Sequence, residues 1–376
     1  MEGLENYEKM RSAFLSFCLS AILLFIGCAK SVTDNNFPSK EIIPTTTQHH
    51  LAITGQGSPI KMLYMGCGHL IIEYNGEMIV TDPYFSIQSF SPTKKIKTNL
   101  QDFERYKATL SQHSVDLTKA KSIWLAHTHY DHMMDIPLLL KQNMLTKNVT
   151  MYGNEFGDDI LQNFITPSQY HTLLPKEVYN PSGKNGTRHW VDSTSSIRIL
   201  PIFSDHAPHT KILGVNVHLM KGKLKNNYFR DHFKTEEAKT NKNQWREGCV
   251  YSFLVDFVKA GKIEYRVFIQ TSASHYPLGQ PPKEVLAEKT IDVAVLCLAS
   301  SNYVTPYPIE ILKALTPKKV VFIHWEDFFE RAEFNKTKLV RLTNFRKIDK
   351  RLLKSGLTPN KEDYVMPQPG TMITID

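Results

Sequence analysis

Short apolar runs separated by polar turns dominate the chain from Lys61 onward, and this pattern predicts many short strands. Lys61–Met65, His69–Tyr74 and Glu77–Thr81 follow one another closely. Asn75-Gly76 joins the last two as a strong hairpin signal. Further strands are expected at Lys121–Ala126, Val149–Tyr152, Ile197–Phe203, Leu213–Leu219, Val250–Val258, Tyr265–Gln270, Val293–Leu298, Val320–His324 and Thr371–Ile375.

Helical spacing of apolar residues appears between these runs. Leu100, Phe103 and Leu110 mark one helix. Further helices are expected at Ile136–Lys141, Phe156–Ile165, Pro308–Leu315 and Leu339–Leu353. Early hairpins followed by alternating strands and helices favour an α/β fold, with two sheets covered by helices. The polar stretch 221–246 has no strand pattern, so we expect a loop insertion there, either a solvated loop or a mobile cover.

The N-terminal segment has the pattern of an export signal. Lys9 and Arg11 precede the apolar run Ala13–Ile26, which is shorter than the roughly 20 residues of a membrane span. The run leads into Cys28 and resembles a bacterial lipobox, with Phe25 where leucine is usual. We expect a lipoprotein-type signal peptide over 1–28, a membrane anchor on lipidated Cys28 at the cell envelope, and a polar tether over 29–58. An ordinary signal peptide or an uncleaved anchor is the alternative.

Composition is that of a globular protein, with 41% hydrophobic and 22% charged residues. The formal net charge of +8 is spread along most of the chain and indicates no nucleic-acid partner by itself. An anionic membrane or substrate would gain something from this charge, but a solvated basic face is the favoured interpretation. Of the five cysteines, Cys67, Cys249 and Cys297 would remain beside Cys28 after export. Their odd number and spacing predict buried thiols rather than a disulfide framework.

The segment Trp124–Asp135, WLAHTHYDHMMD, places polar residues directly after an apolar run. His127, His129 and Asp131 alternate, so in extended backbone their side chains point to the same side, while His132 points elsewhere. Imidazole and carboxylate groups are good ligands for zinc and similar ions. A catalytic site needs about three protein ligands and an open position. The sequence therefore predicts part of a metal site at this strand end.

The spacing H-x-H-x-D-H after a strand resembles the signature of the metallo-β-lactamase superfamily. Tyr64–Ser86 is similar to that family's opening strands, Phe203–His209 to the region of its next metal histidine, and Val320–Phe329 to its late metal-binding strand. The turn Gly66–His69 and the pair His324-Trp325 are most similar to the branch of N-acyl-phosphatidylethanolamine phospholipase D and the ascorbate-phosphate lactonases. The resemblance implies an αββα sandwich over 59–376, in which two mixed sheets pack face to face with helices outside.

The resemblance also implies a ligand set for one or two Zn²⁺ ions, with Mn²⁺ or Fe²⁺ as alternatives. His127, His129 and His206 would bind the first metal; His209 is close to His206 in sequence, but the position of His206 at a strand end favours it. Asp131, His132 and His324 would bind the second metal.

One departure from the family concerns the carboxylate that bridges two metals. After the strand Tyr265–Gln270, Thr271 or Ser272 stands where an aspartate is expected. A neutral hydroxyl offsets the repulsion between two cations about 3.5–4 Å apart less well. The second site is then weak, or another group replaces the carboxylate, or the protein is a degenerate, inactive member.

The expected activity is hydrolysis of an ester, lactone or phosphodiester bond by a metal-bound hydroxide at the cell envelope. Asp131 would hold the second metal, or orient the nucleophile and carry a proton if one metal binds. The alternative is a non-catalytic metal-binding or interaction lipoprotein. Asp82 resembles an acid that orients a metal histidine, or it merely ends its strand. Weaker candidates for substrate contact are His69, His209 and His275. No nucleic acid is expected as a partner, because no appended nucleic-acid module is present.

Overall fold

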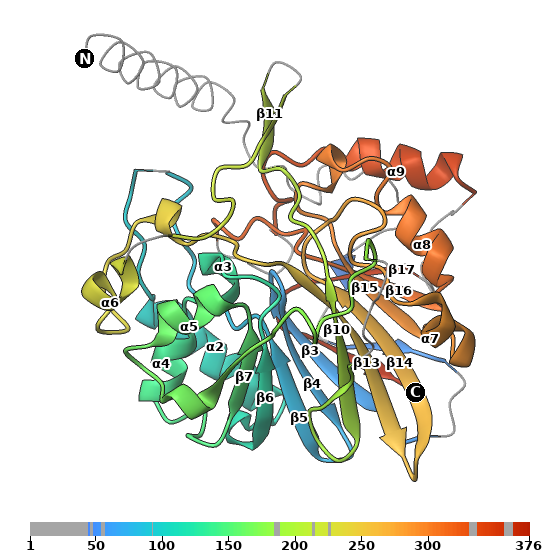
Figure 1. Ribbon diagram of the computed structural model, residues 1–376, viewed down its shortest axis with the longest axis horizontal. Helices are drawn as coiled ribbons and strands as arrows, with labels where there is room; N and C mark the ends of the chain where they lie inside the picture. Colours follow the sequence, from blue (N-terminus) through green and yellow to red (C-terminus); the bar gives the residue numbers. More distant parts are fainter. Residues whose placement is uncertain are drawn as a thin grey trace.

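The computed structural model describes residues 44–45, 48–53, 57–91, 93–183, 189–212, 215–224, 227–330, 337–356 and 364–376. The expected signal peptide 1–28, with Cys28, lies outside these residues, as does most of the expected tether. Figure 1 shows two sheets packed against each other, with helices on both outer faces.

Each large sheet is mixed and has eight strands, in the orders β2-β18-β3-β4-β5-β6-β7-β8 and β1-β17-β16-β15-β14-β13-β10-β9, and β11 pairs with β12 alone. The strands are β1 (Pro44–Thr45), β2 (Gln48–Leu51), β3 (Ile60–Gly66), β4 (His69–Tyr74), β5 (Glu77–Thr81), β6 (Ala120–Trp124), β7 (Thr150–Gly153), β8 (Tyr170–Thr172), β9 (Val191–Asp192), β10 (Ile197–Phe203), β11 (Thr210–Ile212), β12 (Val215–Val217), β13 (Tyr251–Lys259), β14 (Lys262–Gln270), β15 (Val293–Cys297), β16 (Lys319–Ile323), β17 (Tyr364–Pro367) and β18 (Thr371–Ile375).

Strands β5 to β8 run parallel in one sheet, and β14 to β17 run parallel in the other. Parallel strands bring their carboxyl ends to a common edge, where the following loops meet. His127 follows β6, Thr271 follows β14 and His324 follows β16. The topology therefore gathers residues that are far apart in sequence.

Alternation along the strands separates three buried clusters. Ile123 and Leu125 belong to the cluster under the first helical layer, whereas Trp124 between them belongs to the cluster between the sheets. In β14, Val267 and Ile269 likewise face the other sheet. A third cluster lies under the second helical layer. Helix, sheet, sheet and helix form four layers, so the expected fold class is confirmed.

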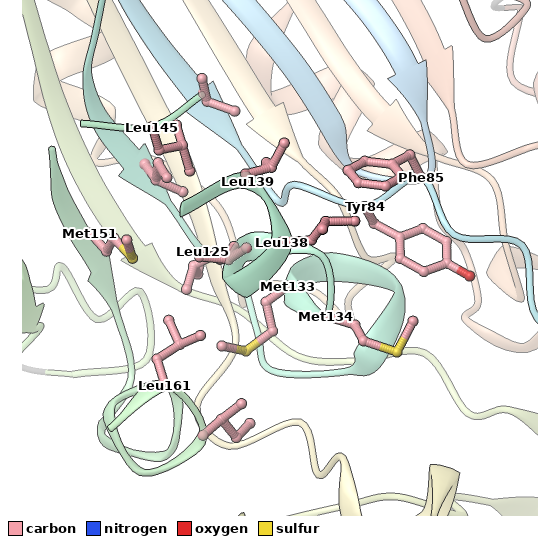
Figure 2. Packing of buried hydrophobic residues seen from close by; sticks show 14 of the residues in the cluster. Tyr84, Phe85, Leu125, Met133, Met134, Leu138, Leu139, Leu145, Met151 and Leu161 are labelled. Carbon is pink, nitrogen blue, oxygen red and sulfur yellow. The ribbon is translucent and has the colours of Figure 1, made fainter. Parts of the chain in front are cut away.

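The helices are α2 (Leu100–Gln112), α3 (Tyr130–Met133), α4 (Ile136–Lys141), α5 (Glu155–Leu161), α6 (Tyr228–His232), α7 (Lys283–Glu288), α8 (Ile309–Leu315) and α9 (Phe345–Lys354). Met133 in α3 and Leu138 and Leu139 in α4 are fully buried against the first sheet (Figure 2). This packing fixes the short helix α3, which carries Asp131 and His132.

Three expected elements differ from the structure. Part of the expected tether forms β1 and β2, because an edge strand needs only backbone partners and not an apolar pattern. Of the strand expected at Leu213–Leu219, only Val215–Val217 forms a strand among the described residues; this is β12, which pairs antiparallel with the preceding β11. The last helix begins at Phe345 and not at Leu339, which makes an isolated bridge to Glu326.

The described part of 221–246 is a packed cover and not a solvated loop. Phe229 and Phe233 contact Trp245 with ring centroids 4.9 and 5.4 Å away, and all three are buried. The cover ends beside the metal-site segment, because Thr128 donates its backbone N–H to Glu247 O at 3.1 Å. These three aromatic residues are widely spaced in a polar segment, so the hydrophobic periodicity of the sequence does not predict their burial.

Cys67 and Cys297 are buried free thiols, as expected, and Cys249 is free but only partly buried. Among the residues that the structure describes, no helix combines the length and apolar character needed to cross a membrane.

Candidate metal centre

The segment after β6 presents four polar side chains to one buried site. His129 is extended, with φ −65° and ψ 153°, and ring nitrogens of His127 and His129 reach the same group of candidate ligands. Helix α3 then begins and places Asp131 and His132 in its first turn. All four side chains are buried. Polar groups this deep need partners, and Nδ1 of His127 has none among the described residues.

His127, His129 and His206 form the first triad, with one ring nitrogen of each within 4.8 Å of the others. Nε2 of His127 lies 3.1 Å from Nδ1 of His129. His206 comes from the loop after β10, and its ring centroid is 4.6 Å from that of His129.

Asp131, His132 and His324 form the second triad. Oδ2 of Asp131 lies 3.8 Å from Nε2 of His132 and 3.3 Å from Nε2 of His324. The triads adjoin, because the ring centroids of His127 and His132 are 3.8 Å apart. The structure thus brings together all six predicted ligands.

Electrostatics fit this site to a divalent metal. Burial lowers the pKa of His129 to about 3 and, with nearby histidines, holds the pKa values of His127 and His206 well below their usual range. These rings are therefore neutral at pH 7 and keep a lone pair for a metal. Nδ1 of His127 and Nδ1 of His324 are buried without hydrogen-bond partners, so the site is incomplete as a purely protein network.

Asp82 contacts the second triad directly. Its Oδ2 lies 2.8 Å from Nδ1 of His132, and its Oδ1 accepts the backbone N–H of Ala126 at 2.8 Å. Burial alone lowers the pKa of His132, but the charge of Asp82 outweighs it and raises that pKa. Gly68 permits this contact, since a Cβ there would lie 2.4 Å from Oδ2 of Asp82. Asp82 therefore lies directly after β5 and also contacts the ring of His132, the histidine that it is predicted to orient.

We expect Asp82→Asn to weaken metal binding at the second triad by about 10–100-fold, because the ring of His132 loses the charge that orients it. Titration of the metal-free protein with Zn²⁺, followed by competition with a chelator, measures this. Affinity at the first triad should stay within about threefold. An equal loss at both triads would show a general folding defect instead.

Two residues that the sequence did not predict, Glu326 and Tyr64, support His324. His324 has φ +54°, an unfavourable backbone conformation for a residue with a side chain. Tyr64 Oη accepts its backbone N–H at 2.9 Å and donates to Oε2 of Glu326 at 2.6 Å. The acidic residue two places after His324 was visible in the sequence, but its link to β3 was not.

Thr271 lies at the second triad, at the end of β14. Its hydroxyl is buried without a partner, and its Cβ is 3.0 Å from the position of a Cβ on Gly68. Ser272 points elsewhere and accepts the backbone N–H of Ala207 at 3.4 Å. Among the described residues, the groups that form the two triads include no side chain from β14 or its end.

The three weaker candidates have different surroundings. His69 is fully buried, and its Nδ1 lies 3.3 Å from Tyr84 N, so it is a core residue. His209 packs against His206 with ring centroids 5.0 Å apart, and its Nε2 is buried without a partner. His275 is partly exposed and pairs with Asp205 at 3.1 Å. Only His209 among the three touches a triad.

Asp135 ties α3 to the loop after β5. Its carboxylate accepts the backbone N–H of Phe85 at 2.7 Å and both the N–H and the hydroxyl of Ser86. Burial raises its pKa to about 6, although these hydrogen bonds oppose the shift. The folded protein therefore holds this proton more tightly than the unfolded chain does.

The unfolding free energy should consequently fall as the pH rises through the raised pKa of Asp135. We expect wild type to lose about 2–3 kcal/mol relative to Asp135→Asn between about pH 4 and about pH 7. Urea unfolding of both proteins at each pH measures this difference. A constant difference across that range would contradict the assignment.

No family model matches the chain, and no curated protein matches it. Igni18, a metallo hydrolase from the archaeon Ignicoccus hospitalis KIN4/I, is similar with TM-score 0.46 and 15% identity over 85% of this chain and 99% of that one. The metallo-β-lactamase fold protein YhfI from Bacillus subtilis has TM-score 0.44 and 11% identity, over 83% and 98% of the two chains. An isothiocyanate hydrolase from Delia radicum gut bacteria has TM-score 0.44 and 13% identity over the same shares. At these values, the activity has to be inferred from the chain's own side chains.

Proposed function

We propose that this protein is a metal-dependent hydrolase of the metallo-β-lactamase type, with zinc as its ion. The observation that carries the proposal is the meeting of two buried triads, with the rings of His127 and His132 3.8 Å apart. Five imidazoles and one carboxylate match the ligand preferences of zinc. A bound zinc ion supplies Lewis acidity and lowers the pKa of water toward neutrality.

The chain's own residues account for binding and orientation. Burial alone raises the pKa of Asp131, but the hydrogen bond from His324 and the interaction with His132 outweigh burial and hold this pKa below its usual range, so the carboxylate stays ionised at neutral pH. It therefore serves as a charged ligand and not as a proton donor. His209, with its unpartnered Nε2 beside His206, is placed to donate a hydrogen bond to a substrate oxygen.

We further propose an ester, lactone or phosphodiester as substrate, and a location at the bacterial cell envelope through lipidated Cys28. The support is the export pattern before Cys28 and the motif similarity around His127 and His324. Membrane attachment would place the site beside lipid-like substrates, and the net charge of +8 suits anionic ones.

The test uses full-length protein, freed of metal and then reloaded with Zn²⁺ or Mn²⁺. Chromogenic phosphodiester, lactone and thioester reporters are assayed before and after reloading. Turnover that disappears with the metal and returns with it supports the proposal. Absence of turnover on all three classes by metal-loaded protein would count against it.

A second function is favoured by the surroundings of Thr271. Where a carboxylate is expected at the end of β14, a neutral hydroxyl is buried without a partner. A protein that binds metal but hydrolyses none of the reporters would be a non-catalytic metal-binding or interaction lipoprotein. Metal content together with turnover separates the two functions.

A further inference from the structure

A cavity of about 170 Å³ lies beside the second triad. One face of α2 forms a wall, with Asp102, Arg105, Tyr106 and Thr109 at helical spacing. The turn after β3 and the residues after β16 close the inner end, through Cys67 and Glu326. The cavity is thus built from segments that are distant in sequence and that also frame the metal centre.

The body of this pocket is largely apolar. Phe85 and Tyr106, two of its rings, stack with centroids 4.5 Å apart, and Phe328 forms another part of the wall. A cavity of about 150 Å³ with apolar walls is known to admit benzene. The pocket therefore has the size for one aromatic ring or a short branched alkyl group.

The charged groups of the pocket divide into two kinds. Its carboxylates have protein partners, for Asp102 accepts the N–H of Ile87 at 3.0 Å and Asp327 pairs with Arg341 at 2.8 Å. Glu330 also pairs with Arg341, and Glu326 is held by Tyr64 and the N–H of Cys67.

Arg105 is different, because it is exposed and makes no ion pair within the part of the chain that the structure describes. Arg105 is therefore the charged side chain of the pocket wall that remains available to a ligand. Its guanidinium favours an anionic group.

We propose that this pocket binds the non-reacting arm of the substrate, an aryl or short branched alkyl group that carries an anionic group paired with Arg105. The inner wall supports this placement. Donor atoms of Cys67, Glu326 and His324 lie within 4.8 Å of one another, and the ring of Phe328 is 5.0 Å from that of His324. A group in the pocket is therefore next to the second triad. That this ligand is a substrate rests on the proposed hydrolysis, whereas binding of the ligand in the pocket does not.

The test is a ¹⁹F NMR titration of full-length protein with 4-fluorobenzoate and with the neutral 4-fluorobenzyl alcohol. Arg105→Met should weaken 4-fluorobenzoate about five- to tenfold and leave the alcohol within about twofold. Lys107→Met is the matched control, because Lys107 is on the same helix but pairs with Glu104 and lies over Phe103 outside the pocket. Thr109→Phe should fill the pocket and reduce binding of both probes.

Equal affinity of 4-fluorobenzoate for wild type and Arg105→Met would overturn the proposal, as would a lack of saturable binding. Binding that needs added Zn²⁺ would place the carboxylate on the metal centre and would also overturn it, so the titration is repeated on metal-free protein. Reporter hydrolysis without probe binding would refute the pocket alone. Probe binding without hydrolysis would refute the proposed function alone.

Discussion

Replacing His127 by alanine is expected to reduce turnover of any accepted reporter by at least about a thousandfold, because metal-ion catalysis contributes several kcal/mol to lowering the barrier. His127 belongs to the first triad and its ring adjoins that of His132 in the second. Its removal would therefore take a ligand atom from the first triad and leave a void beside the second. Steady-state kinetics on metal-loaded protein measures the effect.

His50→Ala is the matched control, since the side chain of His50 is 69% exposed at an edge strand. Turnover and metal content of this variant should equal those of wild type. If His127→Ala kept more than about a tenth of wild-type turnover, the reaction would not depend on the first triad.

Thr271→Asp is expected to have opposite effects on the metal-free and the metal-loaded protein. Thr271 is buried, and its hydroxyl has no partner. Without metal, a buried unpaired carboxylate there should lower the unfolding free energy by about 3 kcal/mol. With zinc, the added negative charge offsets the repulsion between two cations and should strengthen the second site by about tenfold or more.

Thr271→Asn separates charge from shape in this experiment. It has the same size as aspartate but no charge, so zinc should not restore its stability. Thermal unfolding with and without Zn²⁺, together with metal content, compares the two variants. If zinc changed the stability of Thr271→Asp and Thr271→Asn equally, Thr271 would not occupy the position of the expected metal-binding carboxylate.

The spacing of polar residues after β6 predicted four of the six candidate ligands, because these four lie within a few residues of one another. One strand is followed closely by His127, His129, Asp131 and His132, and the helical turn after His129 brings the last two to the same site. Their distant partners His206 and His324 came from motif similarity, since no local pattern states which strand ends meet.

Other features depend on tertiary contacts and escape the sequence. Tyr64 supports His324 from a strand that is 260 residues away. The edge strands β1 and β2 have polar sequences, and the anchors Phe229, Phe233 and Trp245 are scattered in a polar segment. In each case the stabilising partner lies across the fold, so periodicity along the chain carries no signal of it.

Metal content of the purified full-length protein tests the central claim most directly. After dialysis against a metal-free buffer with Zn²⁺ supplied beforehand, elemental analysis should find at least one equivalent of zinc per chain in wild type. The double variant His127→Ala/His132→Ala should retain none. Wild type without bound metal, or a double variant that retains as much as wild type, would contradict the assignment of these triads as a metal centre.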